Sequence, residues 1–486
     1  MGFSNGRWHL DIDALFDAAR EDTRAIFINT PGNPTGWTAT RDELQEILTR
    51  AQARGIWIIA DDLGYADLGF TGCVDIPTPH LDRLAAGGIV CTDGHVSASV
   101  CAPSRAGLIT GRYQQRFGFE CNLGSNQDGL LPDVPTAARL MGEAGYECVG
   151  VGKWHLGYAE ENHPLEVGFE HFTGLRGGSR SYFPKLDKRP SKAQRIERDR
   201  VEVPESEFSY VTDLFTDEAC RLVVERDEER PLFMYLSYTA PHGPMHARAD
   251  LFESFSGIEA ERRRKYAAMV AAMDEGVGRL LATLDAEGMT EETMIVFLSD
   301  NGGATGNASD NGAWRGMKGS KWEGGQRVPC IVRWPGRVPA GQTVPEVVNA
   351  MDLYPTIAGW CGVDVPDDRT LDGRDISTLL EGGDAPPEAP FFYILGGNVE
   401  AVRKGRWKLH VRKWNVERVR LYDLEADPGE FDNIADDPDL REARNSLLAR
   451  ILEKWRDADA MDSAIRQSQK SRFLMRGTMM MEDVDF

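Results

Sequence analysis

Short runs of apolar residues alternate with amphipathic stretches along most of the chain. The clearest runs are 56–60, 147–151, 232–238 and 294–299, all rich in Ile, Val, Phe, Tyr or Met. Runs of this length predict buried strands, and their alternation with helical stretches predicts an α/β fold with a large, mostly parallel sheet flanked by helices. The stretch Arg262–Leu284 has apolar residues at helical spacing and predicts a packed amphipathic helix.

Polar residues follow each of these four runs. They are Asp61 and Asp62 after the first run, Lys153 and His155 after the second, His242 after the third, and Asp300 and Asn301 after the fourth. Because sites in open α/β sheets gather at the carboxyl ends of strands, we expect these side chains to converge in one crevice. Each group also has an ordinary structural explanation, since aspartates cap helices, Asp-Asn-Gly-Gly forms turns, and a histidine beside a proline is often only packed.

Oxygen-bearing side chains dominate two of these groups. Asp61, Asp62, Asp300 and Asn301 offer hard oxygen ligands without sulfur or imidazole among them. Such a set favours calcium or magnesium over a transition metal, and a flexible, carboxylate-rich cage favours calcium, with magnesium possible.

The composition is that of a globular protein with several domains. The chain has 486 residues and a net charge of −22, which argues against a general affinity for nucleic acid or an anionic membrane. Its eight cysteines are scattered without a C-x-x-C pair, so neither a zinc site nor a dense disulfide framework is expected. The N-terminus lacks an apolar signal core and no apolar run could span a bilayer, so we expect a cytoplasmic location. The oligomeric state stays open.

The run Cys101–Arg112 combines a thiol, a turn-forming proline and an arginine. Pro103 suits the first turn of a helix, where free N–H groups attract an anion, and Arg105 adds a planar fork of donors suited to a tetrahedral oxyanion. A cysteine before a helix can also be a buried small hydrophobe. The complete pattern, C-x-P-S-R-x-x-x-x-T-G-R, resembles the signature of the type I sulfatases.

Other motifs extend this resemblance over residues 57–433. The D-D-x-G and S-D-N-G contexts of Asp61 and Asp300 are similar to the metal-binding motifs of that family. The segment Trp314–Gly325 resembles its glycine-rich lysine motif, in which Lys318 aligns and Lys321 is a weaker candidate. Without the family, this loop indicates only anion binding or a solvated surface.

The resemblance implies a fold, an activity and a set of site residues. The implied fold is that of the alkaline phosphatase superfamily, with a catalytic domain over 56–384 and a smaller antiparallel-sheet domain and tail over 385–486. The implied activity is hydrolysis of a sulfate monoester, a carbohydrate or aryl sulfate, to an alcohol and inorganic sulfate, and the implied partner is a sulfated small molecule or carbohydrate. In the family, a formylglycine-generating enzyme oxidises the cysteine to formylglycine, whose hydrate attacks sulfur. The implied catalytic residues are Cys101, Arg105, Lys153, His155, His242 and Lys318, and the implied metal ligands are Asp61, Asp62, modified Cys101, Asp300 and Asn301.

Two alternatives remain open at this point. A phosphonate or phosphate ester hydrolase of the same superfamily would need nearly the same ligands and charges. A noncatalytic binding protein would result if Cys101 is not converted.

The chain before Trp57 resembles something else. Ala25–Gly36, which contains N-P-T-G, and then Asp42–Arg54 resemble a fragment of a fold-type I, pyridoxal-phosphate aminotransferase. In that family Tyr follows the strand-end Asp by three residues, whereas here Gly64 stands at that spacing from Asp61. The fragment is too short for the cofactor fold, so we expect residues 1–55 to be non-catalytic and to end at a junction near Trp57.

Overall fold

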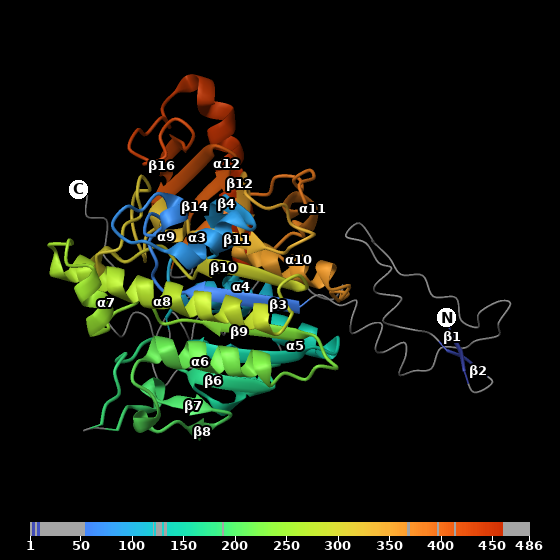
Figure 1. The fold of residues 1–486 in the computed structure, drawn as a ribbon. Helices are drawn as coiled ribbons and strands as arrows, with labels where there is room; N and C mark the ends of the chain where they lie inside the picture. Colours follow the sequence, from blue (N-terminus) through green and yellow to red (C-terminus); the bar gives the residue numbers. More distant parts are fainter. Residues whose placement is uncertain are drawn as a thin grey trace.

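A computed structural model describes ten segments of the chain. They are residues 2–4, 7–9, 54–119, 121–122, 129–130, 134–186, 189–366, 370–395, 398–412 and 415–459. The aminotransferase-like segment Ala25–Gly36 lies outside them. Apart from the short antiparallel pair β1 (Gly2–Ser4) and β2 (Arg7–His9), the described strands form one large and one small sheet (Figure 1).

The large sheet has ten strands in the order β12-β4-β11-β10-β3-β9-β5-β6-β7-β8. Their bounds are β3 Arg54–Ala60, β4 Ile89–His95, β5 Glu147–Lys153, β6 His171–Leu175, β7 Ile196–Arg198, β8 Val201–Glu202, β9 Leu232–Ser237, β10 Thr293–Ser299, β11 Cys330–Arg333 and β12 Gln342–Asn349. The central neighbours β10, β3, β9, β5 and β6 pair in parallel, while β11 and β7 run antiparallel to their neighbours. The four apolar runs of the sequence are the strands β3, β5, β9 and β10, which confirms the predicted sheet.

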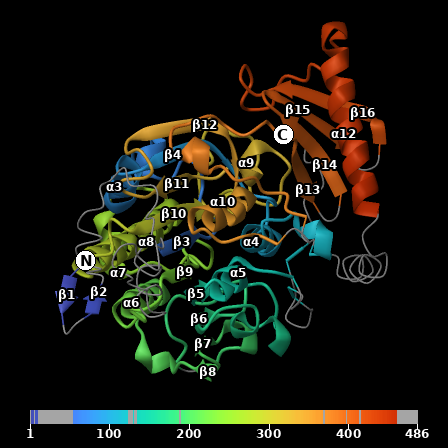
Figure 2. The same cartoon turned by 90° about the vertical axis from the view of Figure 1, so that its right-hand side faces the viewer.

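Helices cover both faces of this sheet because successive residues of its strands point to opposite sides. Along β3, Trp57 and Ile59 belong to one buried cluster, and Ile56 and Ile58 to the other. Helices α4, α5 and α10 pack into the first cluster, and α3, α6 and α8 into the second (Figures 1 and 2). The bounds are α3 Pro79–Ala86, α4 Cys101–Thr110, α5 Ala137–Glu143, α6 Val211–Val224, α7 Ala249–Ser254, α8 Glu261–Ala286, α9 Glu323–Gln326, α10 Leu353–Trp360 and α11 Ser377–Leu380. Helix α8 is the amphipathic helix expected over Arg262–Leu284.

The small sheet is antiparallel and follows the large one in the chain. It contains β13 (Phe391–Leu395), β14 (Asn398–Lys404), β15 (Trp407–Arg412) and β16 (Asn415–Asp423), paired in that order. Helix α12 (Arg441–Asp459) covers it, as Figure 2 shows, and Leu447 and Ile451 of this helix are buried against the sheet. The predicted smaller antiparallel sheet is therefore confirmed.

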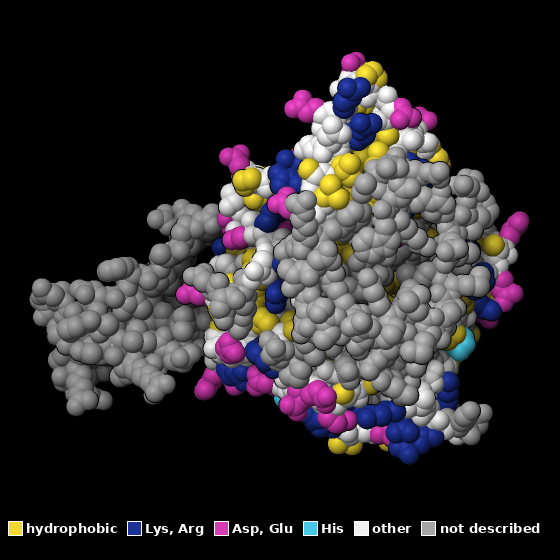
Figure 3. All heavy atoms as spheres, turned by 180° about the vertical axis from the view of Figure 1, so that it is seen from behind, with side chains coloured by type: hydrophobic (Ala, Val, Ile, Leu, Met, Phe, Trp, Pro, Cys, Tyr) yellow, Lys and Arg dark blue, Asp and Glu magenta, His cyan; other side chains and the backbone are white. Residues whose placement is uncertain are grey.

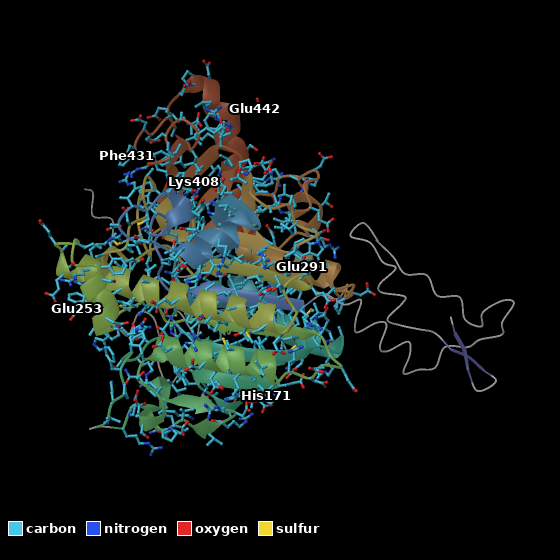
Figure 4. The ribbon with its side chains drawn as sticks, in the orientation of Figure 1. His171, Glu253, Glu291, Lys408, Phe431 and Glu442 are labelled. Carbon is cyan, nitrogen blue, oxygen red and sulfur yellow. The ribbon has the colours of Figure 1, made fainter. Side chains whose placement is uncertain are left out.

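A buried ion-pair network joins the two sheets. We call it the Glu323 network; its members are Glu323, Asp93, Arg403, Lys408 and Glu430. Glu323 begins α9 and accepts hydrogen bonds from Lys408 (2.9 Å) and Arg403 (3.3 Å) of the small sheet. Its main-chain N–H donates to Glu430 (2.8 Å). Lys408 lies where the small sheet meets the rest of the molecule (Figure 4).

The surface carries both signs of charge side by side. Lys, Arg, Asp and Glu side chains are interspersed along the lower edge of the molecule in Figure 3, the region of β7 and β8. Ion pairs there include Arg189 with Glu202 and Arg198 with Glu207. None of the helices in the described part of the chain combines the length and apolarity needed to cross a bilayer.

Candidate active site

The carboxyl ends of β3, β9 and β10 meet at one edge of the large sheet (Figure 1). The Asp61 N–H donates to the Ala240 carbonyl (3.0 Å), and the Asp300 N–H donates to the Ala60 carbonyl (3.0 Å). Asp62 then takes a left-handed backbone conformation (φ 61°), which is uncommon for a residue other than glycine. These links bring Asp61, Asp62 and Asp300 together, as their positions after strands predicted.

Cys101 is the first residue of α4 and faces the aspartates. Its Sγ lies 3.7 Å from Asp61 Oδ1 and 3.8 Å from Asp62 Oδ1. The side chain is buried, and burial raises the pKa of the Cys101 thiol to about 12. Because the thiolate is the nucleophilic form, unmodified Cys101 is a poor nucleophile at neutral pH.

Arg105 lies one turn further along α4 and is fully buried. Its Nε and Nη2 each lie 2.8 Å from Asp300 Oδ2, and its Nη1 donates to the Lys153 carbonyl (3.1 Å) and to Ser237. The guanidinium therefore ties α4 to the ends of three strands. In this arrangement its Nε donates to Asp300 and its Nη1 to Ser237 and the Lys153 carbonyl.

Two lysines contact the paired aspartates from opposite parts of the chain. Lys153, at the end of β5, lies 2.7 Å from Asp61 Oδ2, and Lys318 lies 2.7 Å from Asp62 Oδ1. Burial alone would lower the pKa of each lysine, but the neighbouring anionic groups outweigh it and raise both pKa values. Both side chains are therefore cationic at any pH near neutrality. The main chain of the Lys318 loop is fixed by hydrogen bonds to Gly303 and Ser99.

Two histidines border the same cluster. His155 is buried in a left-handed conformation (φ 60°), and its Nδ1 has no hydrogen-bond partner among the described residues. Burial, together with the charges of Lys153 and Arg105, holds the pKa of His155 well below its usual value, so the ring is neutral. His242 is partly exposed, with Nε2 3.5 Å from Asp62 Oδ2. A neutral, buried imidazole can accept a proton, and the more exposed one can exchange protons with bound substrate.

The charges of this cluster balance. The three acidic side chains are those of Asp61, Asp62 and Asp300, and the three basic ones are those of Arg105, Lys153 and Lys318. A divalent cation and the sulfate dianion released by hydrolysis together add no net charge, and the monoanionic sulfate ester with the same cation adds one positive charge. The cluster could therefore hold either pair without a large excess of buried charge.

The donor set fits a hard divalent cation. Asn301 donates through Nδ2 to Asp62 Oδ1 (2.8 Å), but its buried Oδ1 has no hydrogen-bond partner in the described part of the chain. An unpartnered, buried amide oxygen beside two carboxylates is the kind of ligand that calcium or magnesium takes. Single ligand atoms of Asp61, Asp62, Cys101 and His242 lie within 4.8 Å of one another.

All the residues predicted for the site converge here, whereas Lys321, the weaker candidate, lies 3.4 Å from Glu400 of the small sheet. Which of them ligate a metal or act on substrate stays a prediction. The sequence did not point to Ser237, which ends β9 and accepts a hydrogen bond from Arg105. The only signal for it was its place at a strand end, and the strand register was needed to bring it to Arg105.

Comparisons with known proteins identify the protein family. The profile described as Sulfatase matches residues 55–363. Mouse (Mus musculus) steryl-sulfatase is 33% identical over 430 residues, which cover 71% of this chain and 68% of the relative. Dog (Canis lupus familiaris) N-acetylgalactosamine-6-sulfatase is 34% identical over 381 residues, which cover 74% of this chain and 71% of the relative.

The chain belongs to the sulfatase family. It is accordingly a sulfuric ester hydrolase, and family membership implies formylglycine and a divalent metal. Among solved structures, Ps i-CgsB in complex with k-i-k-neocarrahexaose matches this sulfatase with a TM-score of 0.78 at 32% identity, covering 88% of this chain and 98% of that one. The resemblance and activity inferred from the sequence are therefore confirmed.

Two further profiles match the ends of the sulfatase. The profile for the C-terminal part of N-sulphoglucosamine sulphohydrolase matches residues 317–457. The profile of class I and II aminotransferases matches residues 3–96, which confirms the second resemblance and extends it beyond the junction expected near Trp57. Residues 54–96 nevertheless form β3 and β4 of the large sheet and the helix α3, and the sulfatase profile also matches this segment from residue 55.

Proposed function

We propose that this sulfatase releases inorganic sulfate from a sulfated carbohydrate, using formylglycine at position 101 and a calcium ion. The observation that carries the proposal is the convergence of Cys101, Lys153 and Lys318 on the Asp61–Asp62 pair. The carbohydrate class is supported by relatives named for N-acetylgalactosamine 6-sulfate and by the Ps i-CgsB complex with a neocarrahexaose.

Lys153 and Lys318 are the proposed sulfate-binding groups. Both remain cationic near neutral pH, and each reaches the cluster from a different side, through Asp61 and through Asp62. Cationic donors held in a water-poor site stabilise charge that develops on the transferred group more strongly than they would in water. Arg105 acts indirectly in this proposal, by holding Asp300 and the end of β5 in place.

The two histidines divide the proton transfers. His155 is neutral and buried beside Lys153, so it accepts the proton that the nucleophile at position 101 gives up. His242 is the more exposed ring and faces Asp62, so it donates a proton to the leaving alcohol oxygen. Lys318 is a second donor at that oxygen.

Asp61, Asp62, Asp300 and Asn301, with the oxygen of modified residue 101, would hold the calcium ion. Calcium there would supply a Lewis acid that stabilises negative charge on the nucleophile and on sulfate oxygens. Calcium is proposed over magnesium because the donors are mostly carboxylates from separate loops, and calcium accepts such a flexible, carboxylate-rich set.

Formylglycine supplies an aldehyde-derived oxygen nucleophile that the Cys101 thiol cannot. Since Cys101 is only 1% exposed, we infer that a formylglycine-generating enzyme acts on the chain before α4 packs onto the sheet. The high pKa of the thiol supports the need for this conversion.

The test begins with mass spectrometry of the peptide that contains residue 101, where conversion removes about 18 Da. The calcium-loaded enzyme is then assayed with 4-nitrophenyl sulfate, 4-nitrophenyl phosphate and sulfated sugars. We expect conversion, turnover of sulfated sugars, and a clear preference for sulfate over phosphate with the same leaving group. An unconverted Cys101 in fully active enzyme contradicts the formylglycine assignment, and turnover of aryl sulfate without any sulfated sugar contradicts the carbohydrate class.

A further inference from the structure

The segment Gly177–Phe183, which follows β6, lies between the two active-site histidines. Gly178 packs against the His155 ring so closely that a Cβ at this position would lie 2.7 Å from a ring carbon. Tyr182 donates from its hydroxyl group to the main-chain carbonyl of His242 (2.8 Å) and to that of Thr239. The segment is therefore part of the wall of the active site.

The same segment is fixed to the chain that follows β9. Ser181 Oγ lies 3.3 Å from His246 Nδ1, and Tyr210 donates from its hydroxyl group to the His246 carbonyl (2.9 Å). The rings of Tyr182 and Tyr210 stack with their centroids 5.5 Å apart, and both side chains are 1% exposed. Groups held in this way lose little conformational entropy when a ligand binds.

This rigid base presents an aromatic surface to solvent. Phe183 packs on Tyr210 with centroids 5.3 Å apart, yet its side chain is 38% exposed. The His246 ring lies 6.1 Å from the Phe183 ring at an interplanar angle of 32°. Burial, with the charges of Lys185 and Lys265, lowers the pKa of His246, so this ring is uncharged at neutral pH. We call Phe183 and His246 the Phe183 platform.

We propose that the Phe183 platform stacks against a pyranose ring next to the sulfated sugar of the substrate. This inference rests on the proposed carbohydrate substrate, and it adds a binding position for a second sugar ring. A pyranose ring has an apolar face of C–H groups, which fits the exposed face of an uncharged aromatic ring, whereas a sulfate group gains nothing from such a face. Three residues separate His246 from His242, and Tyr182, which directly precedes Phe183, donates to the His242 carbonyl. The platform therefore adjoins the leaving-group side of the site, where it can contact the substrate beyond its sulfate ester.

The test compares long and short substrates in the calcium-loaded, formylglycine-containing enzyme. The long probes are sulfated hexasaccharides from carrageenan and from chondroitin 6-sulfate, and the short ones are N-acetylgalactosamine 6-sulfate and 4-nitrophenyl sulfate. In Phe183→Ala and Phe183→Leu, the ratio of kcat/KM for the hexasaccharide to kcat/KM for 4-nitrophenyl sulfate should fall about tenfold, the effect of losing one aromatic contact. Phe183→Tyr keeps the flat ring and should keep the ratio.

A control comes from the same loop. Leu186 is apolar and 75% exposed but makes no ring stack, so Leu186→Ala should leave the ratio unchanged. If the hexasaccharide to 4-nitrophenyl sulfate ratio of kcat/KM is unchanged in Phe183→Ala while the wild type hydrolyses hexasaccharides, the Phe183 platform does not bind a sugar. The proposed function is not affected by that result. A wild type that hydrolyses no sulfated sugar overturns both. A loss confined to 4-nitrophenyl sulfate would assign the platform to aromatic leaving groups and overturn the sugar assignment.

Discussion

Replacing Lys408 with methionine should loosen the small sheet from the loop that carries Lys318. Lys408 lies 2.9 Å from Glu323 and 3.0 Å from Glu430, and the side chains of all three residues are fully buried. Methionine fills a similar volume without charge. The substitution therefore leaves two buried carboxylates with less compensation, although Arg403 and the Tyr393 hydroxyl group still reach Glu323 from the small sheet.

The size of the effect follows from this burial. Removing one partner of a buried ion pair costs about 3–5 kcal/mol, because the remaining charge stays desolvated. Protonation of Glu430 limits the loss, since burial first, and then repulsion from Glu323, raises the pKa of Glu430 to about 7. The loss of stability should therefore be larger at pH 8, where Glu430 is ionised, than at pH 6, where it is largely protonated.

Urea unfolding followed by tryptophan fluorescence, at both pH values, measures this loss. Lys404→Met is the matched control, because Lys404 ends β14 and is exposed, and a surface substitution of this kind changes stability by about 0.5 kcal/mol or less. The double variant Lys408→Met/Glu430→Gln removes the surplus negative charge and should recover part of the loss. If Lys408→Met is within about 1 kcal/mol of Lys404→Met at pH 8, the network does not fasten the two sheets.

Four other predictions can be tested with the same protein. Cys101→Ser should stop after at most one slow turnover with sulfate retained on the protein, as seen by intact mass, and steady turnover would contradict the covalent mechanism. Asn301→Ala should lose calcium as well as rate, measured by elemental analysis and kcat, because it removes an unpartnered buried oxygen from the site; calcium content equal to that of the wild type would remove Asn301 from the ligand set. Wild-type stability should fall as pH rises from about 5 to about 7, because the raised pKa of Glu430 makes the folded state bind an extra proton in that window. Glu430→Gln should reduce this pH dependence of the thermal unfolding temperature. An equal pH dependence in both proteins would mean that another group titrates. Deletion of residues 2–52 should leave sulfate release and calcium content intact, and a folded but inactive product would contradict the junction near Trp57.

The strand ends were predictable because their chemistry is local. Asp61 and Asp300 each follow an apolar run directly, and parallel strands bring such positions to one edge whatever the details of packing. The start of α4 at Cys101 was equally predictable, since a proline in the first turn of a helix indicates where that helix begins. For these residues, the position in the sequence was sufficient to predict the position in the fold.

Partners across the fold were not predictable in this way. That Arg105 would reach Asp300 depends on how α4 lies over the ends of β5, β9 and β10, and no spacing in the chain carries that information. The buried ion pair of Glu323 and Lys408 was harder still to predict, because glutamate and lysine are usually surface residues. Their burial becomes visible only when the small sheet is docked against α9.

The Glu323 network also indicates where this enzyme can be recombined with its relatives. A cut near residue 385, between the two sheets, would separate Glu323 from Lys408 and Arg403 and leave each half with buried charges whose partners come from another protein. The C-terminal family profile begins at Met317, inside the lysine loop, and so keeps these partners on one side of the boundary. Chimeras exchanged before Met317 should therefore inherit the lysine loop, α9 and the small sheet as one unit in which Glu323 keeps Lys408 and Arg403. The Asp93 partner of Arg403 would come from the other parent, so that position should be matched between the two.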